Sequence, residues 1–404
     1  MPDNVMQALL LLPEVVPLRR YDNQKKGIAM KSYRMRVFAD GHFACRTVLV
    51  AALAVAALAV TPAFASAAEW SFEYTPSKQG SEGYQNILTS VSCVSATSCV
   101  AVGNNGGLSW NGTEWSIQTG TARDSGVSCS SSLACEAVGL GSSGLAPTAS
   151  AWNGTEWKAQ VVPKPEKWLL GISAAVSCYS STTCMMVGSY ASTAVGGEGK
   201  VYADKWNGSE WKAVSIPQPA EVKELLRLTG ISCTSATVCM ATGSYKNTAG
   251  VEKPFAESWN GTEWKLLASP KAFTGGFGSV SCSSSTSCTT TGSGGEVAAG
   301  WNGTEWKSQS IPRPETADES WIAKGVSCTS ATVCTAVGEA YSNNRTTKEM
   351  FAAFWNGTTW TVQSTPRPKE REESTELNAV SCSSETKCTA VGSFSANGFA
   401  EIYK

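Results

Sequence analysis

Fourteen of the 15 cysteines form seven pairs, and the two members of every pair are separated by five residues. The pairs are Cys93/Cys99, Cys129/Cys135, Cys178/Cys184, Cys233/Cys239, Cys282/Cys288, Cys328/Cys334 and Cys382/Cys388. Thiols at a fixed spacing can bind a metal ion or form disulfides. A metal site would need histidine or a second cysteine pair within each repeat, and neither occurs. We therefore expect seven disulfides, each worth about 2 kcal/mol in the chain-entropy model, and no metal or other cofactor.

The only histidine, His42, lies in an N-terminal segment that we expect to be removed. The mature chain would then lack imidazole, which excludes Ser-His-Asp catalysis, Cys-His catalysis and every metal site that needs histidine. The chain has 32 basic and 33 acidic residues. Because nucleic-acid binding depends on a surplus of basic groups, this balance argues against a nucleic-acid partner.

Tryptophan and asparagine recur in a second phrase, Trp-Asn-Gly-Thr-Glu-Trp with small variations. It begins at Trp110, Trp152, Trp206, Trp259, Trp301 and Trp355, at intervals of 42 to 54 residues. Indole rings can stack on sugars, but a residue that recurs in every repeat more often packs one sheet on the next. The Asn-Gly pair predicts a type I′ turn, in which both residues have positive φ. Asn-Gly-Thr/Ser is also formally an N-glycosylation sequon, and we favour the turn interpretation.

Carboxylates offer the remaining route to catalysis. Asp204, Glu257 and Glu401 share one register, two residues before the aromatic residue that ends a predicted strand. Asp318 and Glu319 lie in a predicted loop. A glycoside hydrolase or lyase could use such acids. No pair stands apart from the repeat, so we predict no catalytic residue.

The elements that position these residues are short strands. Alternation such as Cys-Thr-Ala-Val-Gly, with gaps rich in Ser, Thr and Gly, is typical of β-strands and hairpins. We expect four strands per repeat: one ends at the first Cys, the next begins at the second Cys, the third runs into the first Trp, and the fourth begins at the second Trp. Such a repeat, of roughly 40 to 50 residues, is typical of a β-propeller blade.

The two ends of the predicted domain are complementary. Residues 69–74 match a fourth strand without its first three, and residues 399–404 match a third strand without its fourth. Pairing them completes a seventh blade and leaves no open edge at the seam. The sequence therefore predicts an all-β, seven-bladed propeller over residues 68–404, closed by its N-terminal strand. An open solenoid is the alternative, but it would need polar capping repeats.

The repeat resembles the blades of kelch and galactose-oxidase propellers in its glycine-ended strand, aromatic turn and tryptophan opening the last strand. The turn from Gly112 to Trp115 also resembles the Asp-box turn of sialidase-like propellers, although it is one residue shorter and Asn replaces Asp. The likeness covers about residues 69–404 and implies the propeller fold. Galactose oxidase binds copper through histidines, and sialidases need an arginine cluster, so neither activity carries over. Cys-paired repeats also occur in uncharacterised secreted bacterial proteins, which this chain resembles.

Residues 1–67 are expected to form an N-terminal extension and a signal peptide. Arg36 and Arg46 precede an apolar run at residues 47–60, and small residues follow it. This is the pattern of an export signal, and the run is shorter than the ~20 residues of a membrane span. Cleavage is expected after Ala65 or Ala67, and translation could begin at Met1, Met30 or Met35. The mature protein is therefore expected to be secreted, with no membrane contact.

Variable connections should carry any ligand site, because a rigid scaffold tolerates loop changes on one face. The candidate ligand-binding residues are Trp168, Trp321, Arg227 and Arg313. Trp168 and Trp321 are the tryptophans outside the repeated phrase, and packing of a loop against a sheet is their alternative role. We expect a non-catalytic binding or interaction module whose partner is a glycan or an extracellular protein. A carboxylate-dependent glycoside hydrolase or lyase of the sialidase-like type is the alternative.

Overall fold

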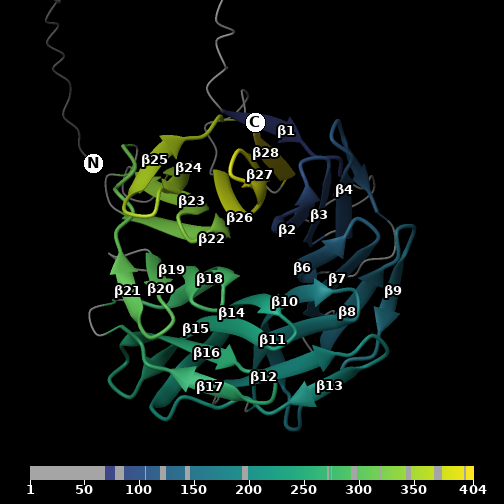
Figure 1. Ribbon diagram of the computed structural model, residues 1–404, viewed down its shortest axis with the longest axis vertical. Helices are drawn as coiled ribbons and strands as arrows, with labels where there is room; N and C mark the ends of the chain where they lie inside the picture. The colour runs from purple at the N-terminus through teal and green to yellow at the C-terminus, as the bar shows by residue number, and fades with distance from the viewer. Residues whose placement is uncertain are drawn as a thin grey trace, which may run out of the picture. The chain divides into compact units, whose positions relative to one another are not determined.

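A computed structural model of the chain describes residues 69–77, 86–104, 106–118, 124–141, 146–192, 199–270, 273, 275–292, 298–315, 317, 320–342, 347–367, 375–394 and 397–404. Within these residues the fold is all-β: seven four-stranded antiparallel sheets form a ring of blades (Figure 1), and there is no helix that could span a membrane. The predicted fold class is confirmed. The predicted signal peptide lies outside the described residues.

Each blade contributes one strand to each of four concentric positions. The innermost strands are β2 (Leu88–Ser95), β6 (Asp124–Ser131), β10 (Leu170–Ser180), β14 (Val222–Ser235), β18 (Phe277–Ser284), β22 (Ser320–Ser330) and β26 (Thr375–Ser384). The second are β3 (Ser98–Gly103), β7 (Ala134–Leu140), β11 (Thr183–Ala191), β15 (Val238–Asn247), β19 (Ser287–Gly292), β23 (Val333–Ser342) and β27 (Lys387–Phe394). The third are β4 (Gly106–Trp110), β8 (Pro147–Trp152), β12 (Gly199–Trp206), β16 (Glu252–Trp259), β20 (Ala298–Trp301), β24 (Thr347–Trp355) and β28 (Asn397–Tyr403). The outermost are β5 (Trp115–Ile117), β9 (Trp157–Gln160), β13 (Trp211–Val214), β17 (Trp264–Leu267), β21 (Trp306–Gln309), β25 (Trp360–Ser364) and β1 (Trp70–Tyr74).

The seventh blade joins the two ends of the domain. Strand β1 pairs with β28, so that Trp70 lies opposite Tyr403 in a sheet with the order β1-β28-β27-β26. Phe72 stacks on Phe399, with ring centroids 4.9 Å apart. The predicted closure by the N-terminal strand is therefore consistent with the structure.

All seven predicted disulfides are present. They join Cys93 to Cys99, Cys129 to Cys135, Cys178 to Cys184, Cys233 to Cys239, Cys282 to Cys288, Cys328 to Cys334 and Cys382 to Cys388. The two cysteines of each pair lie directly opposite each other across the hairpin of the first two strands, as Cys93 and Cys99 do, and their Cα atoms are 3.9–4.0 Å apart. This close approach is typical of a non-hydrogen-bonded pair, whose N–H groups point away from the partner strand. The N–H group of the first cysteine therefore points out of its own blade and needs another acceptor.

The two cysteines of a bridge differ in burial, which the sequence did not indicate. The second member is only 2–4% exposed in every blade, at Cys99, Cys135, Cys184, Cys239, Cys288, Cys334 and Cys388. The first member is partly buried, as at Cys93. The second cysteines belong to the apolar clusters between the sheets, where Cys99 packs with Trp110 and Trp115. Each bridge therefore ties the inner strand to the core and is partly enclosed by it.

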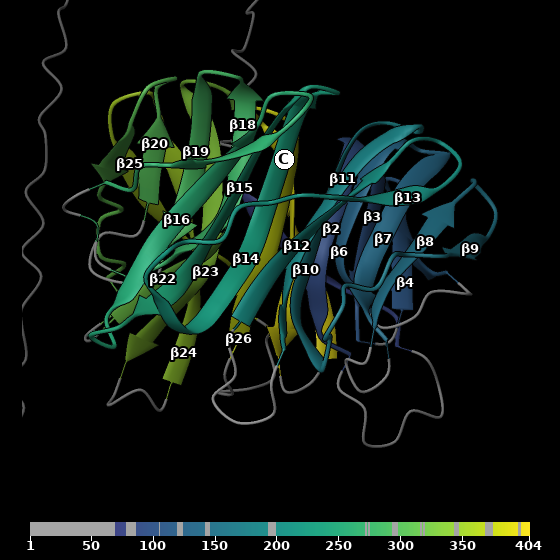
Figure 2. The same ribbon diagram turned by 90° about the horizontal axis from the view of Figure 1, so that it is seen from below.

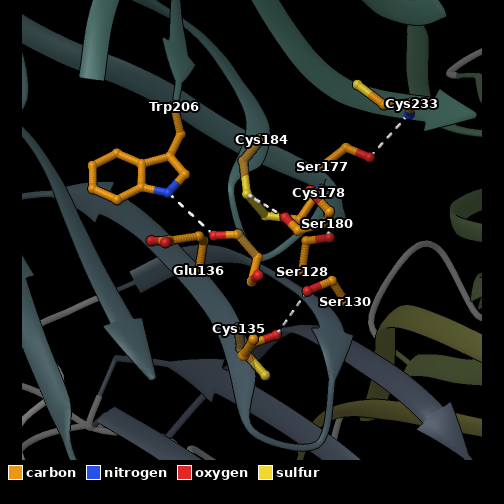
Figure 3. The surroundings of a disulfide bond; sticks show 12 residues. Ser128, Ser130, Cys135, Glu136, Ser177, Cys178, Ser180, Cys184, Trp206 and Cys233 are labelled. Atoms are coloured by element: carbon orange, nitrogen blue, oxygen red, sulfur yellow. Dashed lines mark hydrogen bonds between the residues drawn. A yellow bond between two sulfur atoms is a disulfide. The ribbon is translucent and has the colours of Figure 1, made fainter. Parts of the chain in front are cut away.

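A serine of the neighbouring blade supplies the acceptor for the first cysteine in every case. The serine just before the first cysteine accepts a hydrogen bond from the cysteine N–H of the next blade; Ser177, for example, accepts from Cys233 at 2.9 Å (Figure 3). The seven bonds are Cys93 to Ser381, Cys129 to Ser92, Cys178 to Ser128, Cys233 to Ser177, Cys282 to Ser232, Cys328 to Ser281 and Cys382 to Ser327, all at 2.9 Å. Together they form a closed belt that joins every blade to the next.

A β-bulge interrupts each inner strand. In six blades the register shift includes the residue four positions before the first cysteine: Thr89, Ser125, Thr229, Gly278, Lys324 or Asn378. In β10 the shift occurs earlier, at Ile172. The glycine four residues after the second cysteine lies opposite this part of the inner strand, and a Cβ atom on Gly338 would overlap the Ile322 carbonyl oxygen. Glycine is required there because a side chain would collide with the bulged strand.

The tryptophan pairs pack the blades together, as the sequence predicts. The second tryptophan of each phrase is buried, with 3–7% of its surface exposed. In three places its indole N–H donates to a glutamine on, or directly after, the outermost strand of the preceding blade, as from Trp211 to Gln160 at 2.7 Å. The tryptophans therefore act between neighbouring sheets.

The prediction of a type I′ turn is wrong. Four residues, Asn111 to Glu114, separate the paired Trp110 and Trp115, and only Gly112 has a positive φ, of 99°. The Asn111 side-chain oxygen accepts hydrogen bonds from the backbone N–H groups of Thr113 and Glu114, both at 2.9 Å. The asparagine side chain therefore caps a four-residue loop. A two-residue turn would be too short to contain the N–H groups that it binds.

Replacing one serine of the belt should weaken the ring. In Ser281→Ala the Cys328 N–H loses its acceptor, so we expect a loss of about 1–3 kcal/mol in the free energy of unfolding. Chemical denaturation of the oxidised protein measures this loss. The exposed Ser308→Ala variant on β21 is the control, and equal stability of the two variants would contradict the role of the belt.

Candidate functional site

The inner strands line a cavity of about 690 Å³ on the axis of the ring. All seven inner strands contribute to it, with mostly small or aliphatic side chains. Among the described residues its charged lining groups are Arg227 on β14 and Lys324 on β22, and no carboxylate belongs to the lining. The two charged side chains that line this cavity, the central channel of the ring, are therefore both basic.

The loops at one end of the ring open onto this channel. Because neighbouring strands are antiparallel, the connections between second and third strands lie at the same end as those between blades. Inner strands begin at this end and finish at the disulfides. Arg227 precedes both the bulge and Cys233 in β14, so it lies toward the variable loops. The structure therefore places Arg227, one of the predicted binding residues, at the mouth of the channel.

Lys324 belongs to an ionic cluster between the sixth and seventh blades. Its Nζ atom lies 2.9 Å from a Glu376 oxygen and 3.3 Å from a Glu339 oxygen, and Lys348 contacts the same two carboxylates at 3.3 and 3.1 Å. The Tyr341 hydroxyl donates to Glu339 at 2.6 Å. Burial would raise the pKa of Glu376, but the two lysines lower it to about 2. Lys324 is thus neutralised within the fold.

The two candidate tryptophans lie within the packing of the blades. Trp168 is 7% exposed, and its ring stacks on Tyr190 with centroids 4.8 Å apart while meeting the edge of Tyr202. Trp321 is partly buried on β22, opposite Ala340. Both arrangements correspond to the packing role that the sequence left open. Their ligand-binding role stays a prediction.

Arg313 lies away from the channel, in a second cavity of about 810 Å³ at the outer side of the ring. Trp70, Glu349 and Arg367 also line this cavity, and Arg367 pairs with Glu349. The four candidate ligand residues therefore do not converge. Of these four, Arg227 is the one that lines the central channel.

The register-matched acids are buried, each in a different blade. Asp204 on β12 is 2% exposed, and Glu257 on β16 and Glu401 on β28 are fully buried. Burial raises the pKa of Asp204 to about 7, that of Glu257 to about 8 and that of Glu401 to about 9. Neither carboxyl oxygen of Glu257 has a hydrogen-bond partner. Each of the three acids is therefore enclosed in the packing of its own blade.

The other two candidate acids, Asp318 and Glu319, lie outside the described residues.

Sequence reasoning missed Glu136 on β7, which is 5% exposed and accepts a hydrogen bond from Gln160 at 3.2 Å. Burial raises the pKa of Glu136 to about 8. Its signal was an acid directly after the second cysteine, where the other repeats carry Val, Met or Thr.

No family model and no curated protein sequence matches the chain. Solved structures do match its fold. They include YCF48 from Cyanidioschyzon merolae (14% identity, TM-score 0.53, 83% of this chain and 98% of that one) and YCF48 bound to D1 peptide (13%, 0.52, 83% and 96%). A GH74 xyloglucanase from Xanthomonas campestris matches at 11% identity and TM-score 0.52, and covers 83% of this chain and 53% of that one. These likenesses define the chain as a seven-bladed β-propeller, and the kelch-like or Asp-box-like subtype stays a prediction.

The buried acids should make stability depend on pH. An unfolded glutamate loses its proton near pH 4.5, whereas folded Glu257 keeps it up to about pH 8. Between these values only the unfolded state gains from ionisation, so the contribution of Glu257 to stability is fully present below about pH 4.5 and is lost as the pH rises toward 8. Glu257→Gln removes this decline. We expect its melting temperature at pH 8.5 to exceed that of the wild type by about 2 °C or more.

Thermal unfolding at pH 5, 7 and 8.5 tests this expectation. Glu263→Gln in the exposed turn of the same blade is the control, because its carboxylate is solvated. The same difference between Glu257→Gln and wild type at all three pH values would contradict the prediction.

Proposed function

We propose that this chain is a secreted, non-catalytic binding or interaction propeller that recognises glycans or other cell-envelope components through its variable loop face. The observation that supports this proposal most strongly is the central channel. Its lining draws on all seven blades, contains no carboxylate among the described residues, and places Arg227 toward the loops. A rigid ring with a charged, loop-bordered opening suits recognition.

Rigidity of the scaffold supports the same proposal. Seven disulfides, the serine belt and the tryptophan contacts all lie in the repeated part of the blades. The connecting segments differ in length and composition, as in the segments 163–169, 217–221 and 312–315. Such a division lets a binding surface vary without loss of the fold.

Other proteins of this fold fall into both function classes under consideration. One solved YCF48 structure is bound to D1 peptide, and another matching structure is a xyloglucanase. The alternative function is therefore a carboxylate-dependent glycoside hydrolase or lyase. Separation of Asp204, Glu257 and Glu401 into three blades speaks against their use as a pair, which leaves Asp318 and Glu319 as the acids for that alternative.

Purified protein spanning residues 68–404 can distinguish the two functions. On an array of glycans and cell-envelope peptides, followed by a reducing-sugar release assay, we expect retention of a ligand without turnover. Arg227→Gln should weaken retention by about tenfold, whereas Lys265→Gln on the outer strand β17 should leave it unchanged. Release of reducing ends that disappears in Asp318→Asn or Glu319→Gln would establish the hydrolase alternative instead.

Secretion is part of the proposal. Disulfides form and persist in oxidising compartments outside the cytosol, and the seven bridges fit an extracellular protein. N-terminal sequencing of the exported protein is expected to begin at Ser66 or Ala68. Recovery of the full-length chain from the cell interior, with Met1, Met30 or Met35 at its start, would contradict this expectation.

A further inference from the structure

Strand β14 exposes a stripe of side chains at the mouth of the channel. It is the longest strand of the described residues, with 14 residues. Lys223, Leu225, Arg227 and Thr229 are exposed, whereas the alternating Leu226 and Leu228 are buried at 1% and 0%. Arg227 and Thr229 line the central channel. Exposed residues therefore alternate with buried or partly buried ones from Lys223 to Thr229, and the pairing of β14 with β15 shifts register on both sides of Arg227.

Leu225 is held in an unfavourable backbone conformation. Its φ is +52°, a region that bulky residues rarely adopt, and its side chain is 43% exposed. The conformation costs roughly 1–2 kcal/mol. Because the Leu225 side chain is largely exposed, burial of its apolar surface within the fold does not offset this cost. A strained residue that presents an apolar group outward suggests that the group meets something outside the chain.

The cations of the stripe are unpaired, unlike those on the outer strands. Lysines of four blades each pair with the glutamate two residues earlier, as Lys265 does with Glu263 at 3.0 Å. Among the described residues no carboxylate pairs with Lys223 or Arg227. The positive charge at the channel mouth is therefore available to a ligand.

Further apolar side chains lie on the neighbouring blade. The inner strands β10 and β14 run side by side (Figure 2). Leu169 and Leu170, at the start of β10, are 45% and 47% exposed. Leu170 pairs with Ala191 of β11, whereas Leu225 lies within the register shift between Glu224 and Arg227 of β14. Exposed leucines at the start of β10 and the cations of β14 therefore belong to neighbouring inner strands.

We infer that this stripe binds an acidic peptide segment that carries aliphatic side chains. The inference rests on the proposed binding function and specifies its ligand. Carboxylates of the segment would pair with Arg227 and Lys223, and an aliphatic side chain would cover Leu225. A sugar would be recognised better by an open aromatic face, but the exposed apolar groups here are leucines and Trp168 is already stacked on Tyr190.

A random-peptide display library, selected on purified residues 68–404, tests the inference. We expect the selected peptides to be enriched in Asp or Glu together with Leu or Ile. Fluorescence anisotropy of a selected peptide should show about tenfold weaker binding by Arg227→Gln and by Leu225→Asn. Asparagine tolerates positive φ, so Leu225→Asn removes the apolar group while keeping the backbone.

Matched controls separate these effects from general damage. Lys265→Gln removes an exposed cation from the outer strand β17, and Leu266→Asn removes a leucine of similar exposure to Leu225, 44%, from the same strand. Both should bind the peptide as wild type does. Selection of basic or neutral peptides, or equal binding by all four variants, would overturn the inference while leaving a binding function intact.

The acidic polysaccharide polygalacturonate provides the second arm of the test. Suppose that polygalacturonate binds in an Arg227-dependent manner while the library yields no peptide. The inferred ligand, an acidic peptide, would then be wrong, and the proposed binding site on the loop face would be supported. If the library peptides, polygalacturonate and the array of glycans and cell-envelope peptides all fail to bind, the proposed function fails together with the inference.

Discussion

Each innermost strand turns one edge of its backbone away from its own blade, and the N–H groups on that edge need acceptors. The hydroxyl of the serine before the first cysteine meets this need for the next blade around the ring. An orphaned N–H would cost free energy at every blade, so the fold depends on a serine and a cysteine in adjacent positions. The disulfide holds the cysteine in the non-hydrogen-bonded register that aims its N–H at the neighbour.

Repetition made the fold predictable. The cysteine spacing indicated hairpins, and the complementary ends indicated the closing blade, because both signals are local patterns repeated along the sequence. The serine belt was missed because a serine in a strand looks like any other exposed polar residue, and its acceptor role exists only once a second blade stands beside it. The type I′ turn was wrong because the Asn side chain, as in Asn111, caps a four-residue loop.

The candidate site was less predictable, since loop residues and their neighbours are decided by packing. Trp168 is conspicuous in sequence, but Tyr190 covers one of its faces. Lys324 lines the channel yet is neutralised by Glu339 and Glu376 of two different blades. Arg227 was one of four candidates in the sequence, and the structure distinguishes it from the other three because its strand places it in the lining of the channel, which contains no carboxylate among the described residues.

The pairing of β1 with β28 has a consequence for the order of folding. Cysteines of each disulfide are six positions apart, so six of the seven blades can form from contacts between neighbours in sequence. The seventh blade requires Trp70 to meet Tyr403, more than 300 residues away. Non-local contacts form slowly because a long loop must first close. Oxidation of the hairpins can therefore precede closure of the ring, and the last strand to dock is the first to be made.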